Sequence, residues 1–219
     1  QFIGTKYALG VGSGTQALHL SLRSLDIGPG DEVIVPTLTF AATANAVIYC
    51  GATPVFADVQ SDSFNIDPKS ISQKINKKTK AIIPVHYGGQ ACDMDKIISI
   101  SKKHNLFIVE DCAHALGSTF KKKYCGNIGD IGCYSFYPTK IITTGEGGML
   151  VTNNKKLHDR NRIFRSQGMN IMPNQREKQH KWKYDIVDLG YNYRMDEIGA
   201  ALGFSQSKRI KTINNQRVR

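Results

Sequence analysis

Six short runs of apolar and β-branched residues limit what this chain can fold into. They are mostly continuous rather than alternating, which is typical of strands covered on both faces. The runs are DEVIVP (31–36), TPVFADV (53–59), KAIIPVH (80–86), LFIVED (106–111), IGCYSFY (131–137) and GGMLVTN (147–153). Helix-like segments separate many of them, at 13–25, 40–50, 94–104 and 154–168. Strands alternating with helices predict an α/β fold with an open, mainly parallel sheet and helices on both faces.

The 219 residues are enough for one sizeable α/β domain. We expect residues 1–200 to form it and residues 201–219 to start a helix that leads toward a further, C-terminal domain. The chain begins with Gln1 and ends in the polar run KRIKTINNQRVR, so we expect it to be a piece of a longer polypeptide that lacks its N-terminal segment and small C-terminal domain. The polar, irregular stretch of sequence between Met169 and Asp188 predicts a long loop that could serve as a lid.

Several classes of protein are disfavoured by the composition. No stretch has the roughly 20 apolar residues of a membrane helix, and no leader peptide is recognisable. The five cysteines are odd in number, scattered and without a CxxC pair, which fits neither a disulfide framework nor a zinc site. We therefore expect a cytoplasmic protein without membrane insertion.

The chain is basic, with 29 Lys and Arg against 18 Asp and Glu and a net charge of +11. Such an excess could favour anionic substrates or nucleic acid. The clusters lack a regular stripe and interleaved aromatic residues, which favours solvated surface lysines instead. We expect no nucleic-acid partner, although a basic phosphate-binding or nucleic-acid-binding domain stays open as a hypothesis.

A segment rich in glycines and hydroxyls, GVGSGTQALHL (10–20), follows a short strand-like run and opens a helix. Backbone N–H groups at a helix start, with the helix dipole behind them, can bind phosphate. The spacing is not the dinucleotide G-x-G-x-x-G, because Thr15 stands at the third glycine, and the lysine of a P-loop is absent. The segment indicates a phosphate site or a plain capped turn.

Two neighbouring carboxylates, Glu110 and Asp111, end the run LFIVED. A buried carboxylate needs a partner, because an unpaired charge away from water is costly. A protonated ring nitrogen is one such partner. The alternatives are a metal ion, with His114 as a second ligand, or a helix N-cap role for Asp111. We expect no metal, because no further cluster of His, Asp and Glu accompanies these residues.

Lys140 lies in SFYPTKIITTGEGG (135–148), between a strand-like aromatic run and a series of hydroxyls and glycines. Most lysines simply extend to solvent, but the glycines here would let a ligand approach closely. A lysine amine in this setting can act as an imine-forming nucleophile. Together with the phosphate cradle and the carboxylate, it completes the groups that a pyridoxal 5'-phosphate site requires.

Seven segments, taken in order, resemble the DegT-type sugar aminotransferase family, a branch of the aspartate aminotransferase (fold type I) superfamily. They run through almost the whole chain, so the match is specific. The segments are GVGSGTQAL, GDEVIVPTLTFAATANAV, GATPVFADV, PVHYGGQACDMDKI, VEDCAHALG, SFYPTKIITTGEGGMLVTN and LGYNYRMDEIGAALG. The resemblance implies a fold type I large domain with pyridoxal 5'-phosphate as its cofactor.

The resemblance also implies which residues hold the phosphate and the ring. Ser13, Gly14 and Thr15 would bind the cofactor phosphate, and Ser135 would add a hydroxyl. Phe40, in TLTFAAT, would stack on the pyridine ring, with simple core packing as the alternative.

Four further residues receive roles from the resemblance. Asp111 would pair with the ring nitrogen, and His114 would lie near the phenolic oxygen of the ring. Lys140 would form the internal aldimine and then shuttle the proton between substrate carbon and cofactor. Asn192, in GYNYR, would reach the phosphate of the neighbouring subunit, which implies a homodimer with shared active sites.

The resemblance finally implies a reaction. Related dehydratases carry histidine in place of Lys140, so the lysine indicates transamination. The expected reaction moves an amino group from glutamate to the ketone of a nucleotide-diphosphate keto-sugar, for surface polysaccharide or lipopolysaccharide biosynthesis. PVHYGGQACDMD resembles the branch that makes 4-amino sugars. A non-catalytic regulator or sensor that binds the cofactor stays open as the alternative.

Overall fold

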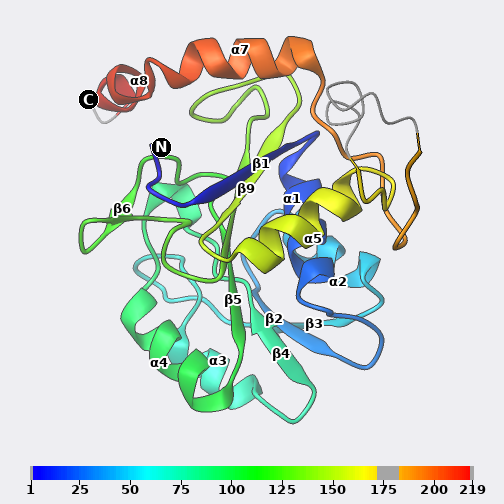
Figure 1. Cartoon of the computed structure of the whole chain (residues 1–219). Coiled ribbons are helices and arrows are strands. Elements are labelled where there is room, and N and C mark those ends of the chain that lie inside the picture. Colours follow the sequence, from blue (N-terminus) through cyan, green and yellow to red (C-terminus); the bar gives the residue numbers. More distant parts are fainter. Residues whose placement is uncertain (1, 172–182, 218–219) are drawn as a thin grey trace.

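A twisted seven-stranded sheet forms the centre of the computed structural model, which describes residues 2–171 and 183–217 (Figure 1). Its strand order is β1-β9-β8-β5-β4-β2-β3, and within the sheet β9 runs antiparallel to both neighbours while the other pairs are parallel. The strands are β1 (Tyr7–Val11), β2 (Glu32–Pro36), β3 (Thr53–Ala57), β4 (Thr79–Ile82), β5 (Phe107–Asp111), β8 (Ile131–Ser135) and β9 (Gly148–Thr152).

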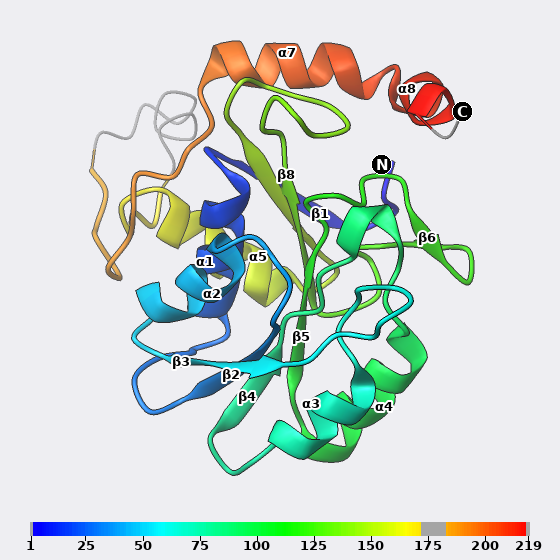
Figure 2. The same ribbon diagram turned by 180° about the vertical axis from the view of Figure 1, so that it is seen from behind.

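Helices cover both faces of this sheet (Figures 1 and 2). One face carries α1 (Gly14–Ser24), α2 (Ala42–Tyr49) and α5 (Lys155–Arg165). The other carries α3 (Pro68–Lys74) and α4 (Met94–His104). The 3-10 turn η1 (Tyr87–Gly89), the hairpin of β6 (Thr119–Phe120) and β7 (Lys123–Tyr124), and helices α7 (Glu197–Ser207) and α8 (Ile210–Arg217) complete the described chain. The predicted α/β fold with a mainly parallel sheet is confirmed.

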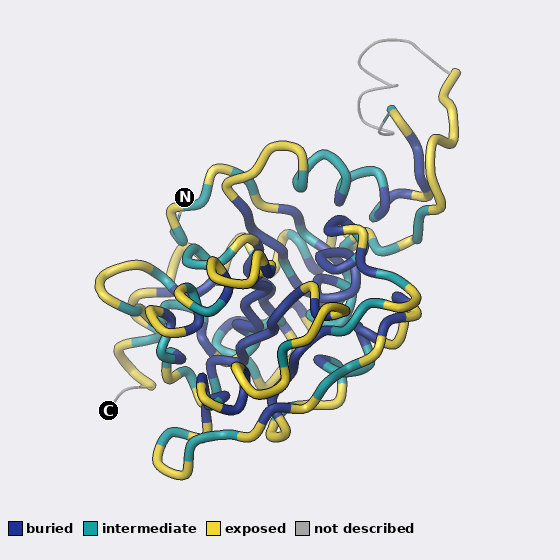
Figure 3. The backbone as a smooth tube through the Cα atoms, turned by 90° about the horizontal axis from the view of Figure 1, so that it is seen from below, coloured by how far each residue is buried: buried dark blue, intermediate teal, exposed yellow. Residues whose placement is uncertain are grey.

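The central strands are buried along most of their length, as their continuous apolar runs predict. In Figure 3 the buried backbone fills the interior, while exposed loops lie outside. Leu150 of β9 pairs with Leu9 of β1 on one side and with Cys133 of β8 on the other, and all three are buried. The edge strand β3 is more exposed, because it has a neighbour on one side alone.

Local signals in the sequence explain the helix starts. Ser13 caps α1, its Oγ accepting a hydrogen bond from the Gln16 N–H at 3.2 Å. Asp67 caps α3, which has Pro68 in its first turn. We did not predict α3 or the β6–β7 hairpin, although the Asp-Pro pair is a recognisable helix start.

The C-terminal segment differs in detail from the expected single helix. α7 crosses the domain boundary expected at residue 200, and the chain turns at residues 208 and 209 before α8. That boundary and the further domain stay predictions. Of the loop expected between Met169 and Asp188, residues 172–182 lie outside the described part; its two ends are joined by a bridge between Met169 and Ile186. Among the described residues, no helix combines the length and the apolar character that a membrane span requires.

An aromatic cluster fastens the segment before α7 to the sheet domain. His19 of α1 is 4% exposed and lies against the rings of Tyr49, Tyr191 and Tyr193. Its Nδ1 lies 3.2 Å from the Tyr193 hydroxyl, whereas its Nε2 has no hydrogen-bond partner among the residues that the structure describes. Burial, and then the charge of Arg23, lower the pKa of His19 to about 4. The folded protein therefore holds this imidazole neutral.

We expect this histidine to make the fold sensitive to acid. Its pKa is 6.5 in an unfolded chain and about 4 in the folded one. The contribution of the neutral imidazole to the free energy of unfolding is therefore complete above pH 6.5 and is lost as the pH falls toward 4. The loss in the free energy of unfolding is up to about 3 kcal/mol. Urea unfolding at pH 7 and pH 4.5 measures it, with His19→Phe as the non-titrating control. An equal loss in both proteins would contradict the assignment.

Candidate active site

A cavity of about 470 Å³ opens at the carboxyl ends of the parallel strands. In an open α/β sheet this edge is where ligands bind. Eight of the nine site residues predicted from the sequence line it: Ser13, Gly14, Thr15, Phe40, Asp111, His114, Ser135 and Lys140. The fold therefore brings together residues that are up to 127 positions apart (13 to 140). Asn192 is exposed and does not line the cavity, and its expected contact with a neighbouring subunit stays a prediction.

The start of α1 forms a cradle against the end of β8. Gly14 and Thr15 stand in the first turn of the helix, where backbone N–H groups have no partner within the helix. A Cβ added at Gly14 would lie 2.8 Å from Cβ of Ser135, so glycine permits this close approach of helix and strand. Thr15 and Ser135, which both carry a hydroxyl, line the cavity. Free N–H groups, hydroxyls and the helix dipole together suit a phosphate group.

Replacing Gly14 by alanine should damage this cradle. The new methyl group would force α1 away from Ser135, and overpacking of this kind costs about 1–3 kcal/mol. We expect roughly tenfold or greater weakening of pyridoxal 5'-phosphate binding to the apoprotein, measured by equilibrium titration. Gly28→Ala is the control, because its nearest neighbour would be a carbonyl oxygen 3.9 Å away. Unchanged affinity in Gly14→Ala would show that the cradle does not bind the phosphate.

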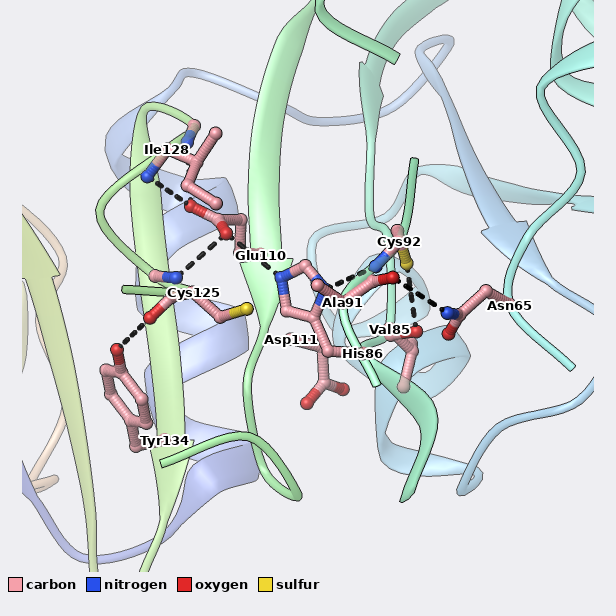
Figure 4. Close-up of polar contacts among 12 residues, drawn as sticks. Asn65, Val85, His86, Ala91, Cys92, Glu110, Asp111, Cys125, Ile128 and Tyr134 are labelled. Carbon is pink, nitrogen blue, oxygen red and sulfur yellow. Dashed lines mark hydrogen bonds and ion pairs between the residues drawn. The ribbon is translucent and has the colours of Figure 1, made fainter. Parts of the chain in front are cut away.

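The two carboxylates at the end of β5 point in opposite directions. Asp111 lines the cavity, while Glu110 points toward the loop that contains Ile128 (Figure 4). Glu110 accepts three backbone N–H groups, from residues 126, 128 and 129, at 2.7–2.8 Å. It also lies 2.9 Å from Nε2 of His86, and both side chains are fully buried. Glu110 is therefore a structural carboxylate with its partners already in place.

The hydrogen bonds also assign the tautomer of His86. Its Nδ1 accepts the Cys92 N–H at 3.1 Å, so the proton is on Nε2, which donates to Glu110 (Figure 4).

Among the described residues, the group with metal-ligand spacing is His86, Glu110 and Cys112, and it does not include His114. The Glu110 oxygens already accept hydrogen bonds from N–H donors and have no lone pair left for a metal ion. We therefore interpret this group as structural.

Asp111 is 6% exposed, and each of its carboxylate oxygens accepts one hydrogen bond. Oδ1 accepts from the Ala113 N–H at 3.1 Å and Oδ2 from the Thr43 hydroxyl at 2.9 Å. The two donors hold the carboxylate in place, and its remaining lone pairs can accept a further hydrogen bond from a group in the cavity.

Lys140 lies on a loop that several hydrogen bonds close at its base. The Phe136 N–H donates to the Gly147 carbonyl at 2.8 Å, and the Thr144 N–H donates to the Phe136 carbonyl at 2.9 Å. From outside the loop, Arg217 of α8 donates to the Lys140 carbonyl at 3.1 Å. The loop is thus fixed at both ends, and Lys140 is the single lysine in the described lining of the cavity.

His114 lies at the same end of the cavity as Lys140. Burial lowers the pKa of His114, the charge of Lys140 lowers it further, and Asp111 partly opposes them. The imidazole is therefore neutral near pH 7 and packs edge-on against Tyr87, with ring centroids 6.1 Å apart. A neutral ring can donate one hydrogen bond and accept another.

Phe40 is 78% exposed, so it is a lining residue of the cavity rather than part of the core. This observation removes core packing as the explanation for Phe40. The lining residues that sequence reasoning missed include Thr39, Thr43, Tyr87 and Glu146. The threonines on either side of Phe40 in TLTFAAT were a usable signal for the first two.

The groups that line the cavity suit pyridoxal 5'-phosphate. The N–H cradle at Gly14 could hold its phosphate, Asp111 could pair with its ring nitrogen, and the Lys140 amine could react with its aldehyde. This set of groups on a mainly parallel sheet is that of the large domain of a fold type I pyridoxal-phosphate enzyme.

Comparison with known proteins leads to the same class. The sequence matches the DegT/DnrJ/EryC1/StrS aminotransferase family over residues 1–219. It is 48% identical to GDP-perosamine synthase of Caulobacter vibrioides over 209 residues, which is 95% of this chain and 54% of that protein. It is 43% identical to the UDP-N-acetyl-3-dehydro-alpha-D-glucosamine 3-aminotransferase of Acidithiobacillus ferrooxidans over 217 residues, 99% of this chain and 56% of that one.

Solved structures agree in fold. Spr1654 of Streptococcus pneumoniae, known in a PMP form and a PLP form, superposes with TM-scores of 0.89 and 0.87 at 35% identity, over 96% of this chain and 58% and 57% of those chains. The chain belongs to the DegT/DnrJ/EryC1/StrS aminotransferase family, whose members use pyridoxal phosphate. It spans about half the length of the curated relatives it matches.

Proposed function

We propose that this chain is the cofactor-binding part of a nucleotide-sugar aminotransferase. In this proposal the enzyme moves an amino group from glutamate to the keto group of a nucleotide-diphosphate keto-sugar, for amino-sugar and surface polysaccharide or lipopolysaccharide biosynthesis. The observation that carries it is that Asp111 and Lys140 meet in one cavity with the phosphate cradle of α1. Similarity to proteins named for GDP-perosamine and for a 3-amino sugar supports the substrate class.

In this proposal each lining residue of the cavity would act on a different part of the cofactor. When bound, pyridoxal 5'-phosphate supplies an electron sink for the substrate carbon that loses a proton. Gly14 and Thr15 would anchor the phosphate, Phe40 would cover the ring, and Asp111 would keep the ring nitrogen protonated. The Lys140 amine would bond covalently to the cofactor aldehyde in the resting enzyme and, once displaced by an amine substrate, would carry the proton from one carbon to the other.

The surroundings of Lys140 leave space for a substrate. A second cavity of about 720 Å³ shares Lys140, His114 and Tyr87 with the first and extends to Asn214 and Arg217. Its described lining contains cationic and hydroxyl side chains and no carboxylate, which suits an anionic, hydroxyl-rich molecule. The outward position of Asn192 and the exposed ring of Phe40 are compatible with a homodimer that shares its active sites. The cytoplasm is the compartment we propose.

A two-step assay on the full-length protein tests the proposal. Glutamate should convert the bound cofactor to its pyridoxamine form, seen as loss of the absorbance band near the visible edge. A panel of nucleotide 4-keto- and 3-keto-sugars is then added, and the one that restores the band is the substrate. A protein that binds pyridoxal phosphate but never reacts with glutamate would instead be a regulator or sensor. Tight, salt-dependent binding of DNA without cofactor binding would favour the nucleic-acid hypothesis.

A further inference from the structure

The side chain of Thr43 connects α2 to the catalytic carboxylate. Thr43 is fully buried in the first turn of α2, and its hydroxyl lies 2.9 Å from Oδ2 of Asp111, which is 68 residues away in the sequence. A second hydroxyl, that of Thr39, lies 2.7 Å from the Thr43 hydroxyl. Both threonines line the cavity, so they form a chain of hydroxyls that ends on Asp111.

The donor and acceptor in each of these hydrogen bonds follow from the charge of Asp111. An ionised carboxylate can only accept hydrogen bonds, and each hydroxyl has one proton to give. Thr43 therefore donates to Asp111, and Thr39 donates to Thr43. Hydrogen bonds arranged in this way polarise one another, and the bond to the charged group is the stronger one.

The position of Thr43 is fixed by the backbone around it. Its N–H donates to the Phe40 carbonyl at 3.1 Å, which holds the turn between β2 and α2. Its β-branched side chain has few rotamers in a helix, and the hydrogen bonds of its hydroxyl to Asp111 and Thr39 select one of them. On its other side the Asp111 carboxylate is held by the Ala113 N–H at 3.1 Å. The two donors together determine which lone pairs of Asp111 face the cavity.

We propose that Thr43, supported by Thr39, is a positioning residue that keeps the Asp111 carboxylate directed at the ring nitrogen of the cofactor. This inference rests on the proposed function, because it assumes that pyridoxal 5'-phosphate occupies the cavity. It predicts that the Thr43 hydroxyl affects the protonation of the cofactor ring, which a residue that merely fills space would not do.

Three variants of the full-length protein separate positioning from packing. Thr43→Val keeps the shape and removes the hydroxyl, and Thr43→Ser keeps the hydroxyl and removes the methyl group. Thr152→Val is the matched control: Thr152 is 2% exposed, and its hydroxyl donates to the Asp130 carbonyl at 2.7 Å. Thr152 pairs with Ile131 at the start of β8, so it lies at the end of the sheet remote from the cavity.

Each variant is measured in three ways. The dissociation constant for pyridoxal 5'-phosphate is obtained by titrating the apoprotein. The protonation of the ring is followed by the ¹⁵N NMR signal of cofactor labelled at the ring nitrogen. Urea unfolding of the apoprotein reports the stability that each substitution costs by itself.

Thr43→Val should bind the cofactor roughly ten- to a hundredfold more weakly, as expected for loss of a hydrogen bond to a charged group. Its ring-nitrogen signal should move toward the unprotonated position, whereas Thr43→Ser should stay close to wild type in both measurements. Thr152→Val should lower stability alone. If Thr43→Val does not fold, Thr39→Val removes the outer link and should shift both measurements in the same direction by less.

Two results would overturn the inference, and they are distinguishable. If the wild-type protein binds the cofactor with a protonated ring and Thr43→Val, or Thr39→Val in its place, does the same with equal affinity, Thr43 does not position Asp111 and the proposed function stands. If the wild-type protein does not bind pyridoxal 5'-phosphate, the proposed function fails and the positioning role fails with it.

Discussion

Lys140→Ala in the full-length protein is expected to bind pyridoxal 5'-phosphate without a covalent bond and to lose transamination. The cradle and Asp111 remain in place, but the single lysine in the described lining of the cavity is gone. Loss of its proton transfer alone should lower turnover by about 10²–10⁴-fold. Loss of covalent attachment should shift the absorbance band near the visible edge, because the bound cofactor is then an aldehyde and no longer an imine.

Borohydride reduction followed by peptide mass spectrometry measures this directly. The wild-type protein should carry the reduced cofactor on the peptide that contains Lys140, and the variant should carry none. Lys80→Ala is the control, because Lys80 is an exposed residue of β4 that does not line the cavity. Transamination of keto-sugars by Lys140→Ala at a rate near that of wild type would contradict the proposed mechanism.

Asp111→Asn should give the second large effect. The substitution keeps the shape of the side chain and its place beside Thr43, but it removes the negative charge that, in the proposed function, would stabilise a protonated ring nitrogen. Without that charge the cofactor is a poorer electron sink, and we expect turnover to fall by about 10²–10³-fold, the loss typical of one electrostatic contact to the transition state. Steady-state kinetics and the ¹⁵N signal of the ring nitrogen measure it.

The neighbouring carboxylate provides the matched comparison. Glu110→Gln changes the adjacent residue on the same strand, but its side chain contacts His86 and three backbone N–H groups instead of the cavity. It should lower the free energy of unfolding by about 1–3 kcal/mol, because an amide cannot accept all four hydrogen bonds. The ring nitrogen should stay protonated. Equal loss of ring protonation in both variants would show that the two carboxylates do not have separate roles.

These two carboxylates also mark a limit of prediction from sequence. Both were recognisable as charges at the end of a buried strand, and side chains alternate along a strand, so one alone can face the cavity. The run LFIVED is apolar on both faces, and periodicity cannot tell which of the two that is. The structure decides it, because Glu110 meets the backbone of residues 126–129 and Asp111 meets Thr43.

Most of the sheet was predictable for a simple reason. Strand runs and helical patterns depend on residues within a few positions of one another, so six strands and four helices could be recognised locally. α3 has the same kind of local signal in Asp67 and Pro68, but its 7 residues are too few to show a clear helical period. The hairpin of β6 and β7 has two residues in each strand, too few to show a period.

The sequence by itself determined the α/β class, the order of strands and helices along the chain, and the types of group at the strand ends, including Gly14, Asp111 and Lys140. The tertiary structure alone decided that these groups share one cavity and that the Thr43 hydroxyl donates to Asp111. The physical reason is that the neighbours of a strand in a parallel sheet come from distant parts of the chain. Local periodicity specifies each element, but packing across the sheet specifies which side chains meet.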